Sequence, residues 1–297
     1  MTIKDRAALA QLFAATGDMQ GQTVDQQRAF FDGLGDMLPG TSDRFEAEPA
    51  TVGGIKGEWV RARGCRNDGA LLYLHGGGYM IGSPRSHRHL AGALSAESGL
   101  PLYVADYRLA PENPFPAAVD DAVAAYEGLL KEGTAPARLA IAGDSAGGGL
   151  TIATLVAARD RGLALPACAI GLSPWCDLSQ GGEAYRTRAK RDPIVKKEGL
   201  DEMASAYLNG ADPKTPLASP LFADLKGLPP LLLQVGTEEA LYDDTVALKA
   251  RAEAAGVEVS AESWGGMIHV WHIFHPILSE GRDAIARVGR YLKSRIE

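Results

Sequence analysis

Cysteine is scarce in this chain of 297 residues, which holds only Cys65, Cys168 and Cys176. Their number is odd and their spacing is not that of metal ligands, so the sequence predicts neither a disulfide framework nor a zinc site. We therefore expect free or buried thiols in a reducing compartment. No structural metal is needed to explain these residues.

Long apolar runs and an excess of basic residues are also missing. No apolar stretch approaches the ~20 residues of a membrane-spanning helix, and the first residues mix charges instead of forming a signal peptide. The formal net charge is −7, which argues against nucleic acid or an anionic membrane as the partner. The sequence predicts a cytoplasmic protein with no membrane span.

What the chain does contain is an alternation of helical and strand patterns. Hydrophobic residues make up 46% of it, enough for the core of one α/β domain. Residues 1 to about 44 are mostly helical in pattern, and the segments 45–52 and 57–63 predict a hairpin. Continuous apolar runs then alternate with helical spacing. This order is typical of a parallel sheet covered on both faces, with buried strands expected near 71–74, 102–105, 139–143, 169–172 and 231–236.

The strand that ends at Gly143 leads into Gly-Asp-Ser-Ala-Gly, which fits the G-x-S-x-G pattern of a nucleophile elbow. A sharp strand-to-helix turn exposes the Ser145 hydroxyl but crowds the residues two before and two after it. Glycine at both positions, Gly143 and Gly147, removes the Cβ atoms that would clash. The turn also directs the Ala146 N–H toward developing negative charge. A phosphate-binding turn is the alternative interpretation of this motif alone.

A second glycine-rich loop follows an earlier buried strand, at His75-Gly76-Gly77-Gly78. Such a loop lets backbone N–H groups approach a ligand without side chains between them. No Gly-Lys-Ser/Thr follows it, which argues against a phosphate loop. We predict an oxyanion hole formed by the N–H groups of Gly77, Gly78 and Ala146.

The two glycine motifs, together with the stretch from Asp106 to Glu112, resemble the bacterial hormone-sensitive-lipase-like esterases of the α/β-hydrolase superfamily, whose elbow reads GDSAG. The resemblance covers almost the whole chain. It implies one α/β-hydrolase domain over residues 1–297, with a mostly parallel eight-stranded sheet. It also implies a helical cap built from about 1–44 and about 179–218. It implies no cofactor and a preference for short acyl chains.

His269 follows the last strand pattern and the turn Gly265-Gly266, where this fold places its catalytic base. His272 and His275 follow at helical spacing, so a metal cluster is an alternative. Apolar residues between them favour a packed helix instead. We predict that His269 is the base and that no metal binds.

The resemblance also directs attention to the acid, because the family usually carries Asp-Pro-Leu after the seventh strand. This chain has Glu239-Ala240-Leu241 there. A glutamate can accept the imidazole hydrogen bond as an aspartate does. We predict Glu239 as the acid, with Asp243 as the alternative.

These residues predict a serine carboxylesterase acting on a small-molecule ester through Ser145, His269 and Glu239. A lactone or amide hydrolase with the same residues is an alternative, and so is a non-catalytic small-molecule-binding protein, against which His269 argues. The sequence does not decide between a monomer and a homodimer. The predicted pocket walls, for which core packing is the alternative role, are Tyr79, Met80, Trp175, Tyr207 and Leu208.

Overall fold

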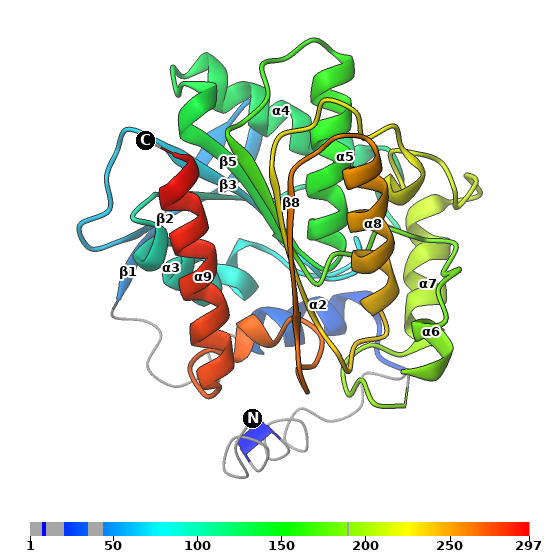
Figure 1. The fold of residues 1–297 in the computed structure, drawn as a ribbon. Coiled ribbons are helices and arrows are strands. Elements are labelled where there is room, and N and C mark those ends of the chain that lie inside the picture. Colours follow the sequence, from blue (N-terminus) through cyan, green and yellow to red (C-terminus); the bar gives the residue numbers. More distant parts are fainter. Residues whose placement is uncertain (1–7, 10–20, 35–43, 189, 297) are drawn as a thin grey trace.

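The computed structural model describes residues 8–9, 21–34, 44–188 and 190–296, and its strands form one eight-stranded sheet in the order β1-β2-β4-β3-β5-β6-β7-β8 (Figure 1). The strands are β1 (Phe45–Val52), β2 (Ile55–Ala62), β3 (Ala70–Leu74), β4 (Leu102–Ala105), β5 (Leu139–Asp144), β6 (Cys168–Leu172), β7 (Leu231–Gly236) and β8 (Val259–Trp264). β2 runs antiparallel to its two neighbours, β1 and β4, and the other five pairs of neighbouring strands are parallel. The predicted mostly parallel sheet and the α/β-hydrolase fold are confirmed.

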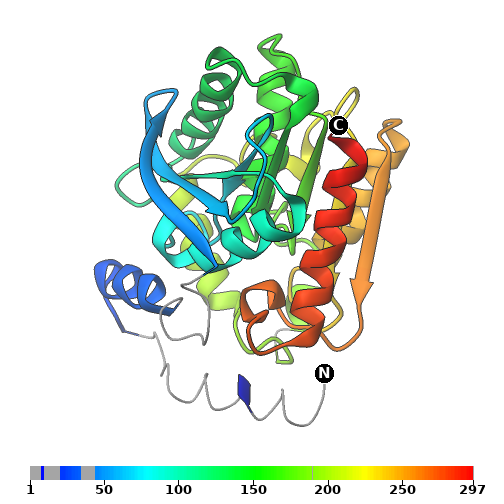
Figure 2. The same cartoon turned by 90° about the vertical axis from the view of Figure 1, so that its left-hand side faces the viewer.

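Two layers of helices cover the sheet, because alternate strand residues point to opposite faces. In β3, Leu71 and Tyr73 belong to one buried cluster, whereas Leu72 and Leu74 belong to the other. The first cluster contains residues of α3 (Pro84–Ser98) and α9 (Ser279–Arg295), and the second contains residues of α4 (Ala117–Lys131), α5 (Ala146–Asp160) and α8 (Tyr242–Ala254). Figure 2 shows α9 lying across one face of the sheet.

The region expected to supply a cap contains three described helices. They are α2 (Val24–Leu34), α6 (Ala184–Thr187) and α7 (Lys197–Leu208), and a short 3-10 helix, η3 (Pro220–Phe222), follows α7. In Figure 1, α6 and α7 lie at the side of the molecule next to α8. Much of the predicted N-terminal helical segment, residues 1–7, 10–20 and 35–43, lies outside the described residues.

Three smaller observations complete the fold. A 3-10 turn, η2 (Pro136–Arg138), precedes β5, and the helical spacing near His272 corresponds to another 3-10 helix, η4 (Trp271–Phe274). The three cysteines are unpaired, and Cys168 and Cys176 are buried. None of the described helices combines the length and hydropathy needed to cross a bilayer.

Candidate active site

Ser145 lies at the tight turn between β5 and α5, and its backbone is strained. Its φ is +53° and its ψ is −122°, a region that non-glycine residues seldom occupy. A Cβ at Gly143 would lie 2.2 Å from the Gly147 carbonyl oxygen, and one at Gly147 would lie 1.9 Å from the Leu74 carbonyl oxygen. Glycine is therefore required on both sides of the turn, for the steric reason that the sequence indicated.

The three residues predicted as nucleophile, base and acid lie in one chain of hydrogen bonds. His269 Nε2 is 2.9 Å from Ser145 Oγ, and His269 Nδ1 is 2.9 Å from Glu239 Oε2. His269 and Glu239 are buried, whereas Ser145 is partly exposed. The three side chains come from the ends of β5, β7 and β8, which meet at the carboxyl edge of the parallel sheet.

Burial and hydrogen bonding act in opposite directions on this imidazole–carboxylate pair. Burial alone would lower the pKa of His269, but the hydrogen bond and the charge of Glu239 outweigh it and raise that pKa above its ordinary value. Burial raises the pKa of Glu239, while hydrogen bonds from His269, Ser173 and Gly236 oppose the rise. Glu239 thus stabilises the imidazolium form of His269.

Ser173, which directly follows β6, is a contact of this pair that the sequence analysis did not single out. Its hydroxyl donates to Glu239 Oε1 at 2.7 Å and accepts from the Val270 N–H at 3.2 Å. The Gly236 N–H also donates to Glu239 Oε1, at 2.6 Å. The available signal was positional, because a polar residue directly after a buried parallel strand lies at the same sheet edge as Ser145.

Asp243, the alternative acid, contacts a different part of the molecule. Its Oδ2 accepts a hydrogen bond from the Ala184 N–H at 2.9 Å, at the start of α6. Asp243 therefore tethers the segment around α6 to the first turn of α8, and its described bond does not involve the imidazole.

Of the two other C-terminal histidines, His272 is buried and His275 is partly buried. His272 Nε2 pairs with Gln234 Oε1 at 2.9 Å, and burial lowers the pKa of His272 to about 3. Burial also lowers the pKa of His275, to about 4. Within the described part of the chain, no group of three or more histidine, cysteine or acidic side chains is arranged to hold a metal ion.

The loop after β3 has the glycine backbone geometry expected of an anion-binding loop. Gly77 and Gly78 have φ values of +113° and +61°, and no described residue accepts a hydrogen bond from either N–H. Asp144, next to the serine, holds the loop by accepting from the Gly76 N–H at 3.1 Å. This geometry leaves the two amides available to a ligand oxygen.

The predicted wall residues all lie in one buried cluster that extends from the glycine loop to α7. The Tyr79 ring stacks on the Tyr207 ring with centroids 3.8 Å apart, and the centroid of the Trp175 ring lies 6.3 Å from that of Tyr79. Met80 and Leu208 belong to the same cluster. The Trp175 Nε1 and the Tyr207 hydroxyl are buried and have no hydrogen-bond partner among the described residues.

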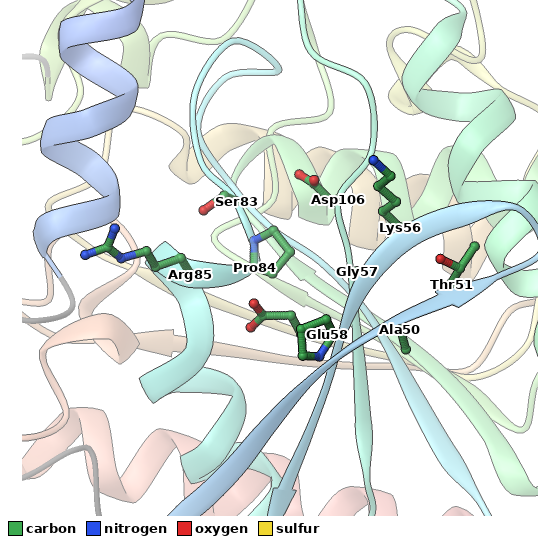
Figure 3. Close-up of a pocket in the computed structure, with 10 residues that line it drawn as sticks. Ala50, Thr51, Lys56, Gly57, Glu58, Ser83, Pro84, Arg85 and Asp106 are labelled. Atoms are coloured by element: carbon green, nitrogen blue, oxygen red, sulfur yellow. The ribbon is translucent and has the colours of Figure 1, made fainter.

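A cavity of about 550 Å³ lies elsewhere, between the β1–β2 hairpin and the start of α3. Figure 3 shows charged side chains of both signs around it, namely Lys56, Glu58, Arg85 and Asp106. None of the residues predicted for the nucleophile, base, acid, oxyanion hole or pocket walls lines this cavity. It is a separate feature of the surface.

Comparison with known families identifies the class of protein. Residues 71–273 match the alpha/beta hydrolase fold family, so the chain belongs to that family. An acetyl-hydrolase from Streptomyces hygroscopicus is 53% identical over 245 residues, which are 82% of this chain and 81% of that protein. An esterase from Acinetobacter venetianus is 33% identical over 268 residues, 90% of this chain and 88% of that one.

Solved structures narrow the class further. A crystal structure of an esterase from the bacterial hormone-sensitive lipase family superposes with a TM-score of 0.96 at 46% identity and covers 100% of both chains. The structure of EstE5 soaked with p-nitrophenyl butyrate gives a TM-score of 0.93 at 47% identity and covers 99% of both chains. The chain is a member of the bacterial hormone-sensitive lipase group, and its enzyme class is ester hydrolase.

Proposed function

We propose that this ester hydrolase is a serine carboxylesterase that cleaves short-chain acyl esters through an acyl-enzyme. The observation that carries the proposal is the continuous hydrogen-bonded chain from Ser145 Oγ through His269 to Glu239, with both links 2.9 Å long. A serine is a weak nucleophile until a base accepts its proton, and a base acts best when a third group orients it.

The reaction runs in two halves. His269 Nε2 takes the proton of Ser145 as Oγ attacks the ester carbonyl carbon, and Glu239 stabilises the imidazolium that forms. His269 then gives the proton to the departing alcohol oxygen, which leaves an acyl group on Ser145. In the second half, water loses a proton to His269 and attacks the acyl carbonyl. The acid is released and Ser145 regains its proton.

The oxyanion of each tetrahedral intermediate is assigned to the N–H groups of Gly77, Gly78 and Ala146. The loop residues have free amides among the described contacts, and Ala146 begins α5, whose N-terminus carries partial positive charge. Donors fixed before the reaction stabilise the charge where it develops, without reorganisation.

We also propose that the segment 179–218, together with α2, caps the serine and limits the substrate to short acyl groups. Met203 of α7 packs on the glycine loop, since a Cβ on Gly78 would lie 2.0 Å from its Sδ. From α2, Arg28 Nε donates to the Met80 carbonyl oxygen at 2.8 Å, and its Nη2 donates to the Ala110 carbonyl oxygen at 2.9 Å. With Tyr79, Tyr207 and Trp175 buried in the same region, little width remains for a long chain.

A panel of p-nitrophenyl esters from acetate to palmitate, with lactones and anilides beside them, tests this function. We expect acetyl to about hexanoyl esters to give the highest kcat/KM, a burst of p-nitrophenol, and covalent labelling that is lost in Ser145→Ala. Faster cleavage of palmitate than of butyrate would refute the short-chain preference. Faster turnover of lactones or anilides would reassign the bond, and binding without turnover would make the chain a binding protein.

A further inference from the structure

A buried aspartate outside the predicted triad contacts the loop that carries the acid. Asp192 lies between α6 and α7 and is fully buried. Its Oδ2 accepts from the Ala240 N–H at 3.1 Å, and its Oδ1 accepts from the N–H groups of Ile194 and Val195, both at 3.0 Å. Both carboxylate oxygens are therefore used, one on the aspartate's own turn and one on the loop of Glu239.

The contact falls next to the acid itself, because Ala240 directly follows Glu239. On the other side of the loop, the Gly236 N–H donates to Glu239 Oε1. The loop 236–240 thus has one attachment at each end, an internal one through Gly236 and an external one through Asp192. A shift of the Ala240 peptide would move Glu239 Oε2 away from the imidazole.

A second side chain of the same segment holds the same loop. An Arg188 Nη1 hydrogen donates to the Thr237 carbonyl oxygen, and the guanidinium lies over the Tyr242 ring, 3.8 Å from its centroid. Arg191 Nη1 lies 3.8 Å from Glu238 Oε2. Arg188, Arg191 and Asp192 therefore contact the acid loop on both sides of Glu239.

We infer that Asp192 is a positioning residue for the proposed acid, tying the segment between α6 and α7 to the Glu239 loop through the Ala240 N–H. The inference rests on the proposed function, in which Glu239 orients His269. Asp192 touches neither the serine nor the imidazole by a described hydrogen bond, so it acts through the loop. Its negative charge also acts on His269 through space, alongside the charges of Glu239 and Asp144.

A double-mutant cycle isolates this contact. Asp192→Asn keeps the shape but has one acceptor oxygen in place of two, so it must face at least one N–H with its own NH₂ group. Ala240→Pro removes the donor and leaves Asp192 intact. The proline that the family usually carries at this position follows an aspartate, whereas here it would follow the longer Glu239. We expect each single variant to lose about tenfold in kcat with KM within about twofold. The double variant should lose little more than either single one, because the same interaction is already gone.

The pH profile separates positioning from mere support of the fold. Removing the Asp192 charge lowers the pKa of His269, so the acid limb of kcat/KM should move to lower pH in Asp192→Asn. Lys196 Nζ donates to the Asp192 carbonyl oxygen at 2.6 Å, and Arg188 and Arg191 contact Thr237 and Glu238 of the acid loop. All three cations are present in the variant. A purely structural defect would leave the limb in place.

Asp201→Asn is the matched control, because it removes a carboxylate from α7 that is paired with Lys197 at the surface. It should retain wild-type kcat and pH profile. A melting curve of each variant shows whether it is folded at the assay temperature. A folding defect is then not mistaken for a loss of kcat.

The inference is overturned if Asp192→Asn keeps wild-type kcat and pH profile, or if the losses of the two single variants multiply in the double variant. Failure of the proposed function would look different. In that case Ser145→Ala or Glu239→Gln would stay active, whatever Asp192→Asn does.

Discussion

The two halves of the site are held in place by different means. The nucleophile half is shaped by backbone: Ser145 has a strained turn, and the glycines beside it allow contacts that no Cβ permits. The acid–base half is held by side chains, since Ser173 and Asp192 reach the Glu239 loop from β6 and from the segment before α7. The nucleophile half depends on the absence of Cβ atoms at its glycines, and the acid–base half depends on the hydrogen bonds of particular side chains.

This difference determines how each half should respond to substitution. Adding one carbon to the backbone-shaped half forces main-chain atoms apart, so fold and activity should fail together. Removing a hydrogen bond from the side-chain half leaves the main chain in place, so activity should fall while the fold persists. The predictions below test that contrast.

The largest effect is expected from Gly147→Ala. The new Cβ would meet the Leu74 carbonyl oxygen at 1.9 Å, and that oxygen belongs to β3 at the centre of the sheet. Relief requires a main-chain shift, so we expect a loss of about 3 kcal/mol or more in the free energy of unfolding and no measurable esterase activity. Urea unfolding beside the ester assay measures both.

Gly199→Ala is the matched control, because Gly199 lies in the first turn of α7 with nothing within 4 Å of the added Cβ. It should keep full activity and gain up to about 1 kcal/mol from better helix propensity. A folded and active Gly147→Ala variant would contradict the steric account of the elbow.

Glu239→Gln should give the next largest effect, confined to chemistry. The amide nearly keeps the shape but loses the charge that stabilises imidazolium, and it can favour the wrong imidazole tautomer. The equivalent change in a serine-protease triad costs about 10⁴ in kcat, and we expect a loss of at least ~10² here with KM little changed. Asp243→Asn should leave kcat near wild type. Loss of kcat in a well-folded Asp243→Asn, with Glu239→Gln active, would reverse the acid assignment.

The same contrast explains which parts of the site could be predicted from the sequence. The local sequence was enough to recognise Gly143, Gly147 and the glycines after β3, because a tight turn requires glycine at fixed positions within a few residues. The alternation of apolar runs likewise predicted the sheet. Glu239 needed the resemblance to a family. Ser173 and Asp192 were not singled out, because their partners lie 66 and 48 residues away and no local pattern marks such a contact.

Ser173→Ala should give an intermediate effect. It removes the donor to Glu239 Oε1 and leaves the Val270 N–H without its acceptor, while the Gly236 N–H still holds the carboxylate. A loss of about 1.4 kcal/mol in transition-state stabilisation corresponds to roughly tenfold in kcat. Ser173→Thr keeps the hydroxyl and should restore part of that loss. Equal kinetics of the alanine and threonine variants would show that the hydroxyl does not position the acid.

The smallest effect is a displacement of the pH profile. Only neutral imidazole accepts the Ser145 proton, so activity falls as pH drops through the pKa of His269. Glu239 holds that pKa above its ordinary value, so the acid limb of kcat/KM should lie above about 6.5. Removing the carboxylate lowers the pKa, and the residual activity of Glu239→Gln should therefore persist to lower pH than wild-type activity does. Rate profiles from pH 5 to 9 measure this, and a limb that stays in place or moves upward in Glu239→Gln would mean that the charge of Glu239 does not govern the base.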